Sequence, residues 1–341
     1  MPGIKALAKR LNISIGTVSR ALNDKPGVNA ETRERVMQMA QEMGYVANAA
    51  GRNLRKGRTN TIGLIIGTGP TALAGDNFFS EVVDEMQSVL LDDGIDLVVL
   101  PVHSAMDPLA FLRRTLMRGT LDGIILTATQ VNDPRIEIME AASMPYMTLG
   151  RSRTPGDYLW IDLDFEEGAR QAVTRLAELG HRRIAVCVPK EGVNFASIYE
   201  DSWRATMTAL GLPATDDLCF ADDGSEDGGA RVAARLAALN DRPTAVLMCA
   251  EPMTSGVYGG LQAAGLRPGA DVSVIAFRQS PLMRHLSPPI SCFEMSVKQL
   301  GRDMADAIFA LTYGSKTGTA PQSSLLPMTY IERPSVQALT D

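Results

Sequence analysis

The residues with the widest chemical repertoire in this chain, its cysteines and histidines, are spaced too far apart to form a metal site. Zinc sites usually contain closely spaced pairs such as CxxC, and the sequence has none among these residues. Three of the four cysteines lie in apolar, strand-like runs, which predicts buried free thiols rather than disulfides. The residues concerned are Cys187, Cys219, Cys249, Cys292, His103, His181 and His285.

A glycine-rich segment, 67–72 (GTGPTA), has the form of a dinucleotide-binding loop because it directly follows an apolar, strand-like run. The next such run ends at 100–103 (LPVH) without the acidic residue that would bind a ribose. Pro70, Ala74 and Gly75 also favour a loop over a helix start. No Walker A, HExxH or GxSxG pattern occurs. We therefore expect a protein that is not an enzyme and needs no cofactor.

The amino-terminal residues have the pattern of a DNA-binding unit. Apolar residues in 4–11 recur at helical spacing, and Ser14 can cap a second helix over 15–22 by accepting a backbone N–H. Two short helices joined by a short turn form a helix-turn-helix unit. Short side chains with one arginine suit close approach to a major groove. The outward face of the second helix carries Ile15, Gly16, Ser19 and Arg20.

A third helix should complete a small all-α core. Asn29 can serve as its N-cap, Gly44 is a stop signal, and Val36 and Ala40 belong to the apolar stripe between them. The next segment, 48–58, contains four Arg/Lys and is too polar to bury. It is expected to form a marginal helix or a hinge.

The charge of the chain is segregated along its length. The 341 residues carry a net charge of −6, which by itself would argue against nucleic acid. Residues 1–60, however, hold eleven Lys/Arg and four Asp/Glu, a net charge of +7, and the remaining 281 residues carry −13. This asymmetry indicates a basic, nucleic-acid-binding head on an acidic body that disfavours DNA.

Beyond residue 60, strand-like and helical patterns alternate in two series, 62–149 and 158–277. Strands of near-continuous Val, Ile and Leu with helical crossovers predict parallel sheets covered on both faces. A last helix near 297–313 and a strand near 324–331 are expected to cross back. Ligands of such sheets bind outside the carboxyl ends of the strands, so a cleft between two lobes is the expected small-molecule site.

Residues 4–23 (IKALAKRLNISIGTVSRALN) and 28–45 (VNAETRERVMQMAQEMGY) resemble the headpiece of the LacI/GalR repressors. Residues 48–54 resemble the family's hinge helix, which lies in the minor groove and wedges a leucine into a base step; Leu54 is the matching residue. The resemblance implies a homodimer that binds double-stranded operator DNA at a pseudo-palindrome. The DNA-binding residues that it implies are Ser14, Ile15, Gly16, Thr17, Ser19, Arg20, Asn23, Asn48, Arg52 and Leu54.

The resemblance covers essentially the whole chain and also implies the fold. We expect an α/β, two-lobed, periplasmic-binding-protein-like (type I) core of parallel sheets, preceded by a small all-α helix-turn-helix domain. The last residues contain no leucine heptads, so we expect a dimer and no heptad-based tetramer. The expected boundaries are 1–47 for the headpiece, 48–59 for the hinge, 60–158 with 292–322 for the first lobe, and 159–291 with 323–341 for the second.

The residues expected to bind a small effector follow the strands of the two lobes. They are Asn77, Phe78, Phe79, Arg151, Tyr199, Asp201, Trp203, Glu251 and Arg278. Three depart from the family pattern, because Tyr199 replaces an Arg, Glu251 begins Glu-Pro where Asn-Asp is usual, and Arg278 replaces an Asp. Two interpretations follow. Arg151 and Arg278 could hold a carboxylate or phosphate, or Glu251 or Asp201 could pair with Arg278 and leave a site for a neutral sugar.

The resemblance implies a transcriptional regulator that represses a carbohydrate uptake or catabolic operon. A sugar, sugar acid or sugar phosphate in the cleft would release it from DNA. A corepressor-dependent regulator is one alternative, and a sugar-binding transport protein without a DNA role is another. No apolar run approaches the roughly 18 residues of a membrane helix, and the first residues lack the features of a secretory signal. We therefore expect a cytoplasmic protein with no membrane partner.

Overall fold

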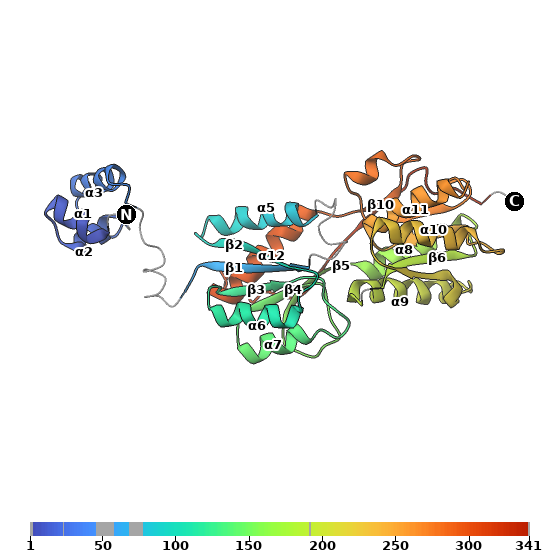
Figure 1. The fold of residues 1–341 in the computed structure, drawn as a ribbon, viewed down its shortest axis with the longest axis horizontal. Helices are drawn as coiled ribbons and strands as arrows, with labels where there is room; N and C mark the ends of the chain where they lie inside the picture. The colour runs from blue at the N-terminus through green and yellow to red at the C-terminus, as the bar shows by residue number, and fades with distance from the viewer. Residues whose placement is uncertain (1–2, 23, 46–57, 68–77, 191, 340–341) are drawn as a thin grey trace. The chain divides into compact units, whose positions relative to one another are not determined.

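A computed structural model describes residues 3–22, 24–45, 58–67, 78–190 and 192–339. The chain divides after Thr59 into two compact units (Figure 1). This division coincides with the end of the segment expected to form the hinge. The boundary expected after residue 47 lies outside the described residues.

The described residues of the smaller unit form three short helices, α1 (Ile4–Leu11), α2 (Ile15–Leu22) and α3 (Ala30–Glu42). The Asn29 side chain accepts the Thr32 N–H at 2.8 Å at the start of α3, and the Ser14 hydroxyl accepts the Thr17 N–H at 3.0 Å at the start of α2. The predicted helices and both caps are therefore confirmed. The helices enclose one small core of Leu7, Ala8, Leu11, Val18, Ala21, Val36 and Ala40.

The larger unit contains two six-stranded sheets. The first has the order β11-β5-β4-β3-β1-β2, and all its strands are parallel. Helices α5 and α12 cover one face of this sheet, and α6 and α7 cover the other (Figure 1). Their buried apolar residues belong to two separate core clusters. The strands are β1 (Thr61–Gly67), β2 (Asp96–Val102), β3 (Gly123–Leu126), β4 (Tyr146–Leu149), β5 (Leu159–Leu163) and β11 (Ser324–Leu326). The helices are α5 (Phe78–Leu91), α6 (Pro108–Arg118), α7 (Pro134–Ala142) and α12 (Val297–Tyr313).

The second sheet has the order β12-β10-β9-β8-β6-β7, and β12 alone among its strands pairs antiparallel. Its two faces are covered by α8 with α9 and by α10 with α11. The strands are β6 (Ile184–Pro189), β7 (Cys219–Asp222), β8 (Ala245–Met248), β9 (Ser273–Ala276), β10 (Ser291–Glu294) and β12 (Thr329–Ile331). The helices are α8 (Phe165–Glu178), α9 (Asn194–Ala209), α10 (Glu226–Ala237) and α11 (Glu251–Ala263), with 3₁₀ turns at Asp216–Leu218 and Leu282–His285.

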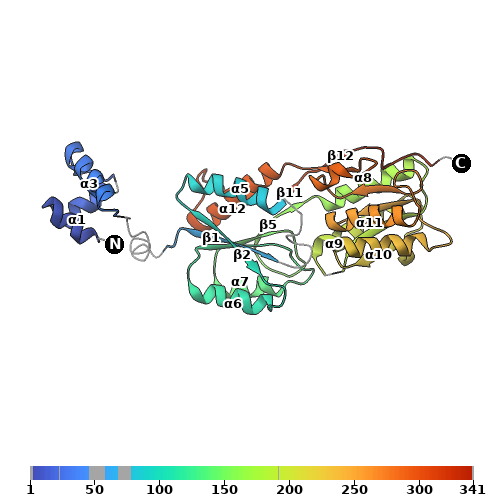
Figure 2. The same ribbon diagram turned by 45° about the horizontal axis from the view of Figure 1, so that its top comes forward.

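The chain crosses between the two lobes three times: between β5 and α8, between β10 and α12, and between β11 and β12 (Figures 1 and 2). This corrects the lobe boundaries expected from the sequence. Strands β5 and β11 belong to the first lobe and β10 to the second, whereas the sequence placed each in the other lobe. A run of apolar residues identifies a buried strand but does not say which sheet the strand joins. Strand β5 is the example: it pairs with β4 of the first lobe, where Leu159 lies opposite Met147.

The cysteines of the chain agree with the sequence-based expectation of buried free thiols. All four cysteines are free, and Cys187, Cys249 and Cys292 are buried. Burial raises the pKa of the Cys187 and Cys249 thiols, which keeps them protonated and unreactive. No described helix is long and apolar enough to cross a bilayer.

A buried histidine ties the last described segment to the second sheet. His181 Nδ1 lies 2.8 Å from the Thr244 hydroxyl, and Nε2 lies 3.0 Å from the carbonyl oxygen of Gln337. In the neutral ring, Nε2–H donates to the carbonyl while Nδ1 accepts from the hydroxyl. Burial lowers the pKa of His181, so the folded chain favours this neutral form.

We predict that the free energy of unfolding falls by about 1 kcal/mol between pH 7.5 and pH 5.5 because of His181. In the unfolded chain the imidazole binds a proton near its ordinary pKa of about 6.5, whereas the folded protein resists protonation, so acid favours unfolding. Urea unfolding at both pH values measures this loss, which His181→Gln should remove. The exposed His285 is the control: His285→Gln should keep the pH dependence of the unmodified chain. An unchanged dependence in His181→Gln would contradict the assignment.

Candidate DNA-binding surface and candidate effector site

Helix α2 leaves one face uncovered by the core of the small unit. Val18 and Ala21 are buried, whereas Ile15, Gly16 and Arg20 are exposed. Ser14 is also exposed, and Thr17 and Ser19 are half-buried. Residues at positions 15, 16, 19 and 20 lie on one side of a helix by their spacing. The structure thus brings the described members of the predicted DNA-binding set together. Asn23, Asn48, Arg52 and Leu54 lie outside the described residues.

The turn after α2 is held by α3. Arg33 forms an ion pair with Asp24 at 2.7 Å and donates a second hydrogen bond to the Lys25 carbonyl at 3.1 Å. Asp24 has a left-handed backbone, with φ of 51°. These contacts fix the end of α2 relative to α3. A helix that enters a DNA groove needs such a fixed orientation.

A cavity of about 240 Å³ lies between the two lobes, at the carboxyl ends of their strands. In each sheet the strand order reverses between the first strand and its neighbour, at β1/β3 and at β6/β8. Crevices at such positions are the usual ligand sites of open α/β sheets. The residues that line the cavity are Phe78, Phe79, Ala128, Thr129, Leu149, Gly150, Asp162, Leu163, Phe165, Pro189, Val193, Phe195, Gly224, Cys249, Ala250, Glu251, Pro252, Phe277 and Arg278.

Five phenylalanine rings form most of the apolar wall. Phe165 stacks on Phe277 with 4.8 Å between ring centroids and on Phe195 with 5.3 Å. Phe78 and Phe79 of the first lobe meet edge to face at 5.3 Å. The guanidinium of Arg278, from the second lobe, lies over the Phe78 ring at 5.2 Å. A ligand in the cavity therefore meets aromatic faces from both lobes.

The charged groups at the cavity are paired within the protein. Glu251 and Arg278 form an ion pair of 2.7 Å, with 5% and 7% of their side-chain surfaces exposed. Asp162 accepts from the Arg151 Nε at 2.9 Å, and Arg151 also contacts Glu166 at 2.6 Å. Burial raises the pKa of Asp162, and the hydrogen bond from Arg151 opposes that rise. The sequence left open whether Arg278 is available to an anion or pairs with Glu251 or Asp201; in the structure it pairs with Glu251, whereas Asp201 pairs with Arg153.

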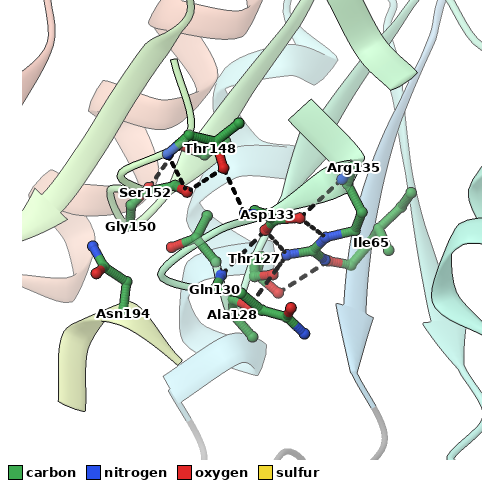
Figure 3. A network of polar contacts seen from close by, with 12 residues as sticks. Ile65, Thr127, Ala128, Gln130, Asp133, Arg135, Thr148, Gly150, Ser152 and Asn194 are labelled. Carbon is green, nitrogen blue, oxygen red and sulfur yellow. Dashed lines mark hydrogen bonds and ion pairs between the residues drawn. The ribbon is translucent and has the colours of Figure 1, made fainter. Parts of the chain in front are cut away.

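The loop after β3 is held by a buried ion pair (Figure 3). Arg135 donates to both carboxylate oxygens of Asp133, at 2.9 and 2.6 Å, and to the carbonyls of Thr127 and Ala128 at 3.0 and 3.2 Å. Asp133 also accepts the backbone N–H of Gln130 at 3.2 Å. Ala128 has a left-handed backbone, with φ of 50°, which is unfavourable for a residue with a Cβ. The network holds this strained residue in the cavity wall.

Four predicted effector residues, Tyr199, Trp203, Asp201 and Arg151, do not line the cavity. Tyr199 and Trp203 are fully buried in the second lobe, where the Trp203 indole N–H donates to the Ile184 carbonyl at 3.1 Å. With Met207 they occupy every fourth position of α9, which is the spacing of its buried face. Asp201 lies on the exposed side of α9 and pairs with Arg153 at 2.7 Å.

The physical reason for this correction is the start of α9: the sequence pattern predicts this helix over 198–210, whereas α9 begins one turn earlier, at Asn194. Val193 and Phe195, at its first turn, are the residues that reach the cavity. The Arg151 side chain likewise lies outside the lining, against Asp162 and Glu166. Phe78, Phe79, Glu251 and Arg278 are the predicted residues that the structure brings together there, and Asn77 lies outside the described residues.

Several lining residues were missed from the sequence although they carry the same signal. Ala128 and Thr129 lie two and three residues after the end of β3, and Phe277 directly follows β9, so each stands just beyond the carboxyl end of a strand. Phe165 begins α8, directly after a crossing between lobes. Applying the strand-end rule to every strand would have found the first three, whereas Phe165 depends on knowing where the chain crosses.

Comparison with known proteins finds the same two parts, a DNA-binding headpiece and a periplasmic-binding-protein-like body. Residues 3–48 match the model of the lacI family of bacterial regulatory proteins, and residues 173–336 match that of a periplasmic binding protein-like domain. The HTH-type transcriptional regulator AglR of Rhizobium meliloti (strain 1021) is 30% identical over 95% of this chain and 96% of its own length. The HTH-type transcriptional regulator CelR of Thermobifida fusca is 29% identical over 93% of each chain.

Solved structures share the fold. A transcriptional regulator CelR–cellobiose complex is 26% identical, with a TM-score of 0.73 over 98% of this chain and 100% of that one. A lac repressor dimer bound to operator and the anti-inducer ONPF is 23% identical, with a TM-score of 0.85 over 98% of each chain. These relatives are regulators rather than enzymes.

We predict that Asp133→Ala lowers the free energy of unfolding of the larger unit by about 3 kcal/mol, because it leaves the Arg135 guanidinium without its buried partner. Asp107→Ala is the matched control, since Asp107 also caps a helix directly before a proline but is exposed. Losing that cap should cost about 1 kcal/mol. Urea unfolding of both variants measures the difference. If both variants lose the same free energy of unfolding, the ion pair of Asp133 with Arg135 contributes no stability beyond the helix cap.

Proposed function

Since the chain belongs to the LacI family of bacterial regulators of transcription, we propose that it represses a carbohydrate uptake or catabolic operon. In this proposal a homodimer binds a pseudo-palindromic operator and leaves it when a sugar or sugar derivative fills the cavity between the lobes. The observation that carries the proposal is that rings of both lobes, Phe78 and Phe79 from one and Phe165 and Phe277 from the other, line that cavity.

The DNA half of the proposal rests on α2. Its exposed face presents Ile15, Gly16 and Arg20. An isoleucine offers apolar contact, as with a thymine methyl, and a glycine lets the backbone approach closely, while arginine can bind guanine or phosphate. With few side chains to read bases, DNA shape should contribute to operator choice. Leu54 remains the proposed wedge at the central base step.

The effector half rests on contacts that join the lobes. Arg278 of the second lobe lies over Phe78 of the first, and Arg153 in the loop after β4 pairs with Asp201 of α9. A molecule that enters between the lobes must alter such contacts, and a ligand shifts an equilibrium between arrangements that it binds unequally. Sugar as the effector class is supported by the flat rings of the wall and by the cellobiose bound to a solved relative.

The homodimer is supported by the edge of the first sheet. Strand β2 lies at that edge and exposes 38% of Val98. Val98 lines a surface hollow with Leu100 and Phe111 of α6. We propose that a second copy of the chain covers this apolar edge, since a helix-turn-helix unit reads a pseudo-palindrome as a pair.

For the DNA role, the full chain is used to select binding sites from a pool of DNA duplexes of random sequence. We expect these enriched sites to be pseudo-palindromes. Arg20→Ala should weaken binding to the enriched site by about 1–3 kcal/mol, measured by fluorescence anisotropy at fixed salt. Arg113→Ala, which removes an exposed arginine of α6 in the body, should leave the affinity unchanged. Undiminished binding by Arg20→Ala would remove that residue from the interface.

For the effector role, a sugar that raises the melting temperature of the protein should weaken binding to the same site. A sugar that strengthens binding would instead establish the corepressor alternative. Absence of any enriched site would favour a sugar-binding protein without a DNA role.

For the dimer, Val98→Glu should raise the dimer dissociation constant by about tenfold or more, because it places a charge in an apolar interface. Sedimentation of the full chain over a dilution series measures this. Leu210→Glu is the control, since Leu210 is similarly exposed at the end of α9 in the second lobe. If Val98→Glu and Leu210→Glu give the same dimer dissociation constant, the interface lies elsewhere. A stable tetramer of the unmodified chain would contradict the expected assembly.

A further inference from the structure

We infer that the buried Glu251–Arg278 pair selects the charge of the effector, so that the cavity admits uncharged ligands and excludes anionic ones. The inference rests on the proposed role of this cavity as the effector site. It assigns a specificity-determining function to two residues that depart from the family pattern.

The pair joins two elements of the second lobe, the start of α11 and the end of β9. Glu251 is the first residue of α11, where the helix dipole stabilises a carboxylate. Arg278 lies just beyond β9, and its Nη2 is 2.7 Å from Glu251 Oε2. The same guanidinium lies over the Phe78 ring, with its Cζ 5.2 Å from the ring centroid. The positive charge that an anionic ligand would need is therefore already compensated and held in place.

The second guanidinium near the cavity is also engaged. Arg151 pairs with Asp162 on one side and with Glu166 on the other. Asp162 and Glu251 both line the cavity and are buried, so the part of the wall that the structure describes presents these two carboxylates together with the guanidinium of Arg278. An anion that entered would face those carboxylates in a poorly hydrated space, where like charges repel strongly.

Displacing Glu251 to free Arg278 would also be unfavourable. The displaced carboxylate would remain among Phe277, Pro252 and other apolar neighbours without a counter-ion, and an unpaired buried charge costs several kcal/mol. An uncharged, hydroxyl-bearing ligand avoids this cost. Its O–H groups can donate to the remaining lone pairs of both carboxylates while its apolar faces pack on the phenylalanine rings.

The unmodified protein provides the first test. Matched neutral and acidic sugars, glucose with glucuronate and galactose with galacturonate, are titrated calorimetrically at constant ionic strength. We expect each acid to bind about tenfold or more weakly than its neutral counterpart, or not measurably. An acid that binds as tightly as its neutral counterpart, or more tightly, would overturn the inference.

The second test removes the counter-ion of Arg278 and uses inorganic phosphate as the probe. Glu251→Gln should bind phosphate about tenfold more tightly than the unmodified chain, because the buried guanidinium then lacks a partner. Adding Arg278→Gln should abolish the gain. Asp271→Asn is the matched control, since it frees Arg267, whose side chain is 76% exposed, and should give no gain. No gain in Glu251→Gln would overturn the inference.

These tests separate failure of the inference from failure of the proposed function. If Glu251→Gln does not fold, the comparison of neutral and acidic sugars in the unmodified chain still decides the matter. If no sugar binds but Glu251→Gln captures phosphate, the pair does exclude anions and only the sugar class of the proposal fails. Operator binding by the unmodified chain is measured separately and depends on neither result.

Discussion

The structure of the body depends on one constraint: two parallel sheets are joined by three crossings that keep the carboxyl ends of their strands opposite each other. Each sheet is completed by a strand that the chain adds after it has crossed to the other lobe and come back. This strand is β11 in the first sheet and β12 in the second. The cavity, its aromatic wall and its buried ion pairs all lie where these ends meet. Any change in how the lobes meet is therefore a change in the cavity, which is the property that a small-molecule switch requires.

Electrostatics works differently in the small unit and at the cavity of the larger unit. The amino-terminal 60 residues carry a net charge of +7 and leave the arginine and small residues of α2 exposed, where they can meet a polyanion. At the cavity the charges cancel locally, as Glu251 with Arg278 and Asp162 with Arg151. A charge exposed to solvent remains available to a partner, whereas a charge paired inside the protein restricts what can bind beside it.

Local signals in the sequence predicted much of the fold because they act over a few residues. Asn29 and Ser14 cap helices through backbone groups three positions away. Runs of Val, Ile and Leu identified the buried strands. The errors came where the outcome depends on distant residues. Nothing local says that β5 pairs with β4 and not with a strand of the second lobe, and α9 begins a turn earlier than expected, which places Tyr199 and Trp203 in the core.

The sequence by itself determined the class of protein, the order of its parts, the segregation of charge and four of the residues that line the cavity, because each of these follows from a motif, a composition or a strand end. Only the tertiary structure decided which residues meet. Glu251 and Arg278 lie 27 positions apart along the chain, and the choice between Glu251 and Asp201 as the partner of Arg278 was open until the fold placed α11 beside the end of β9. The charge presented to a ligand depends on such pairs, since a buried arginine binds an anion or is neutralised according to its neighbours in space.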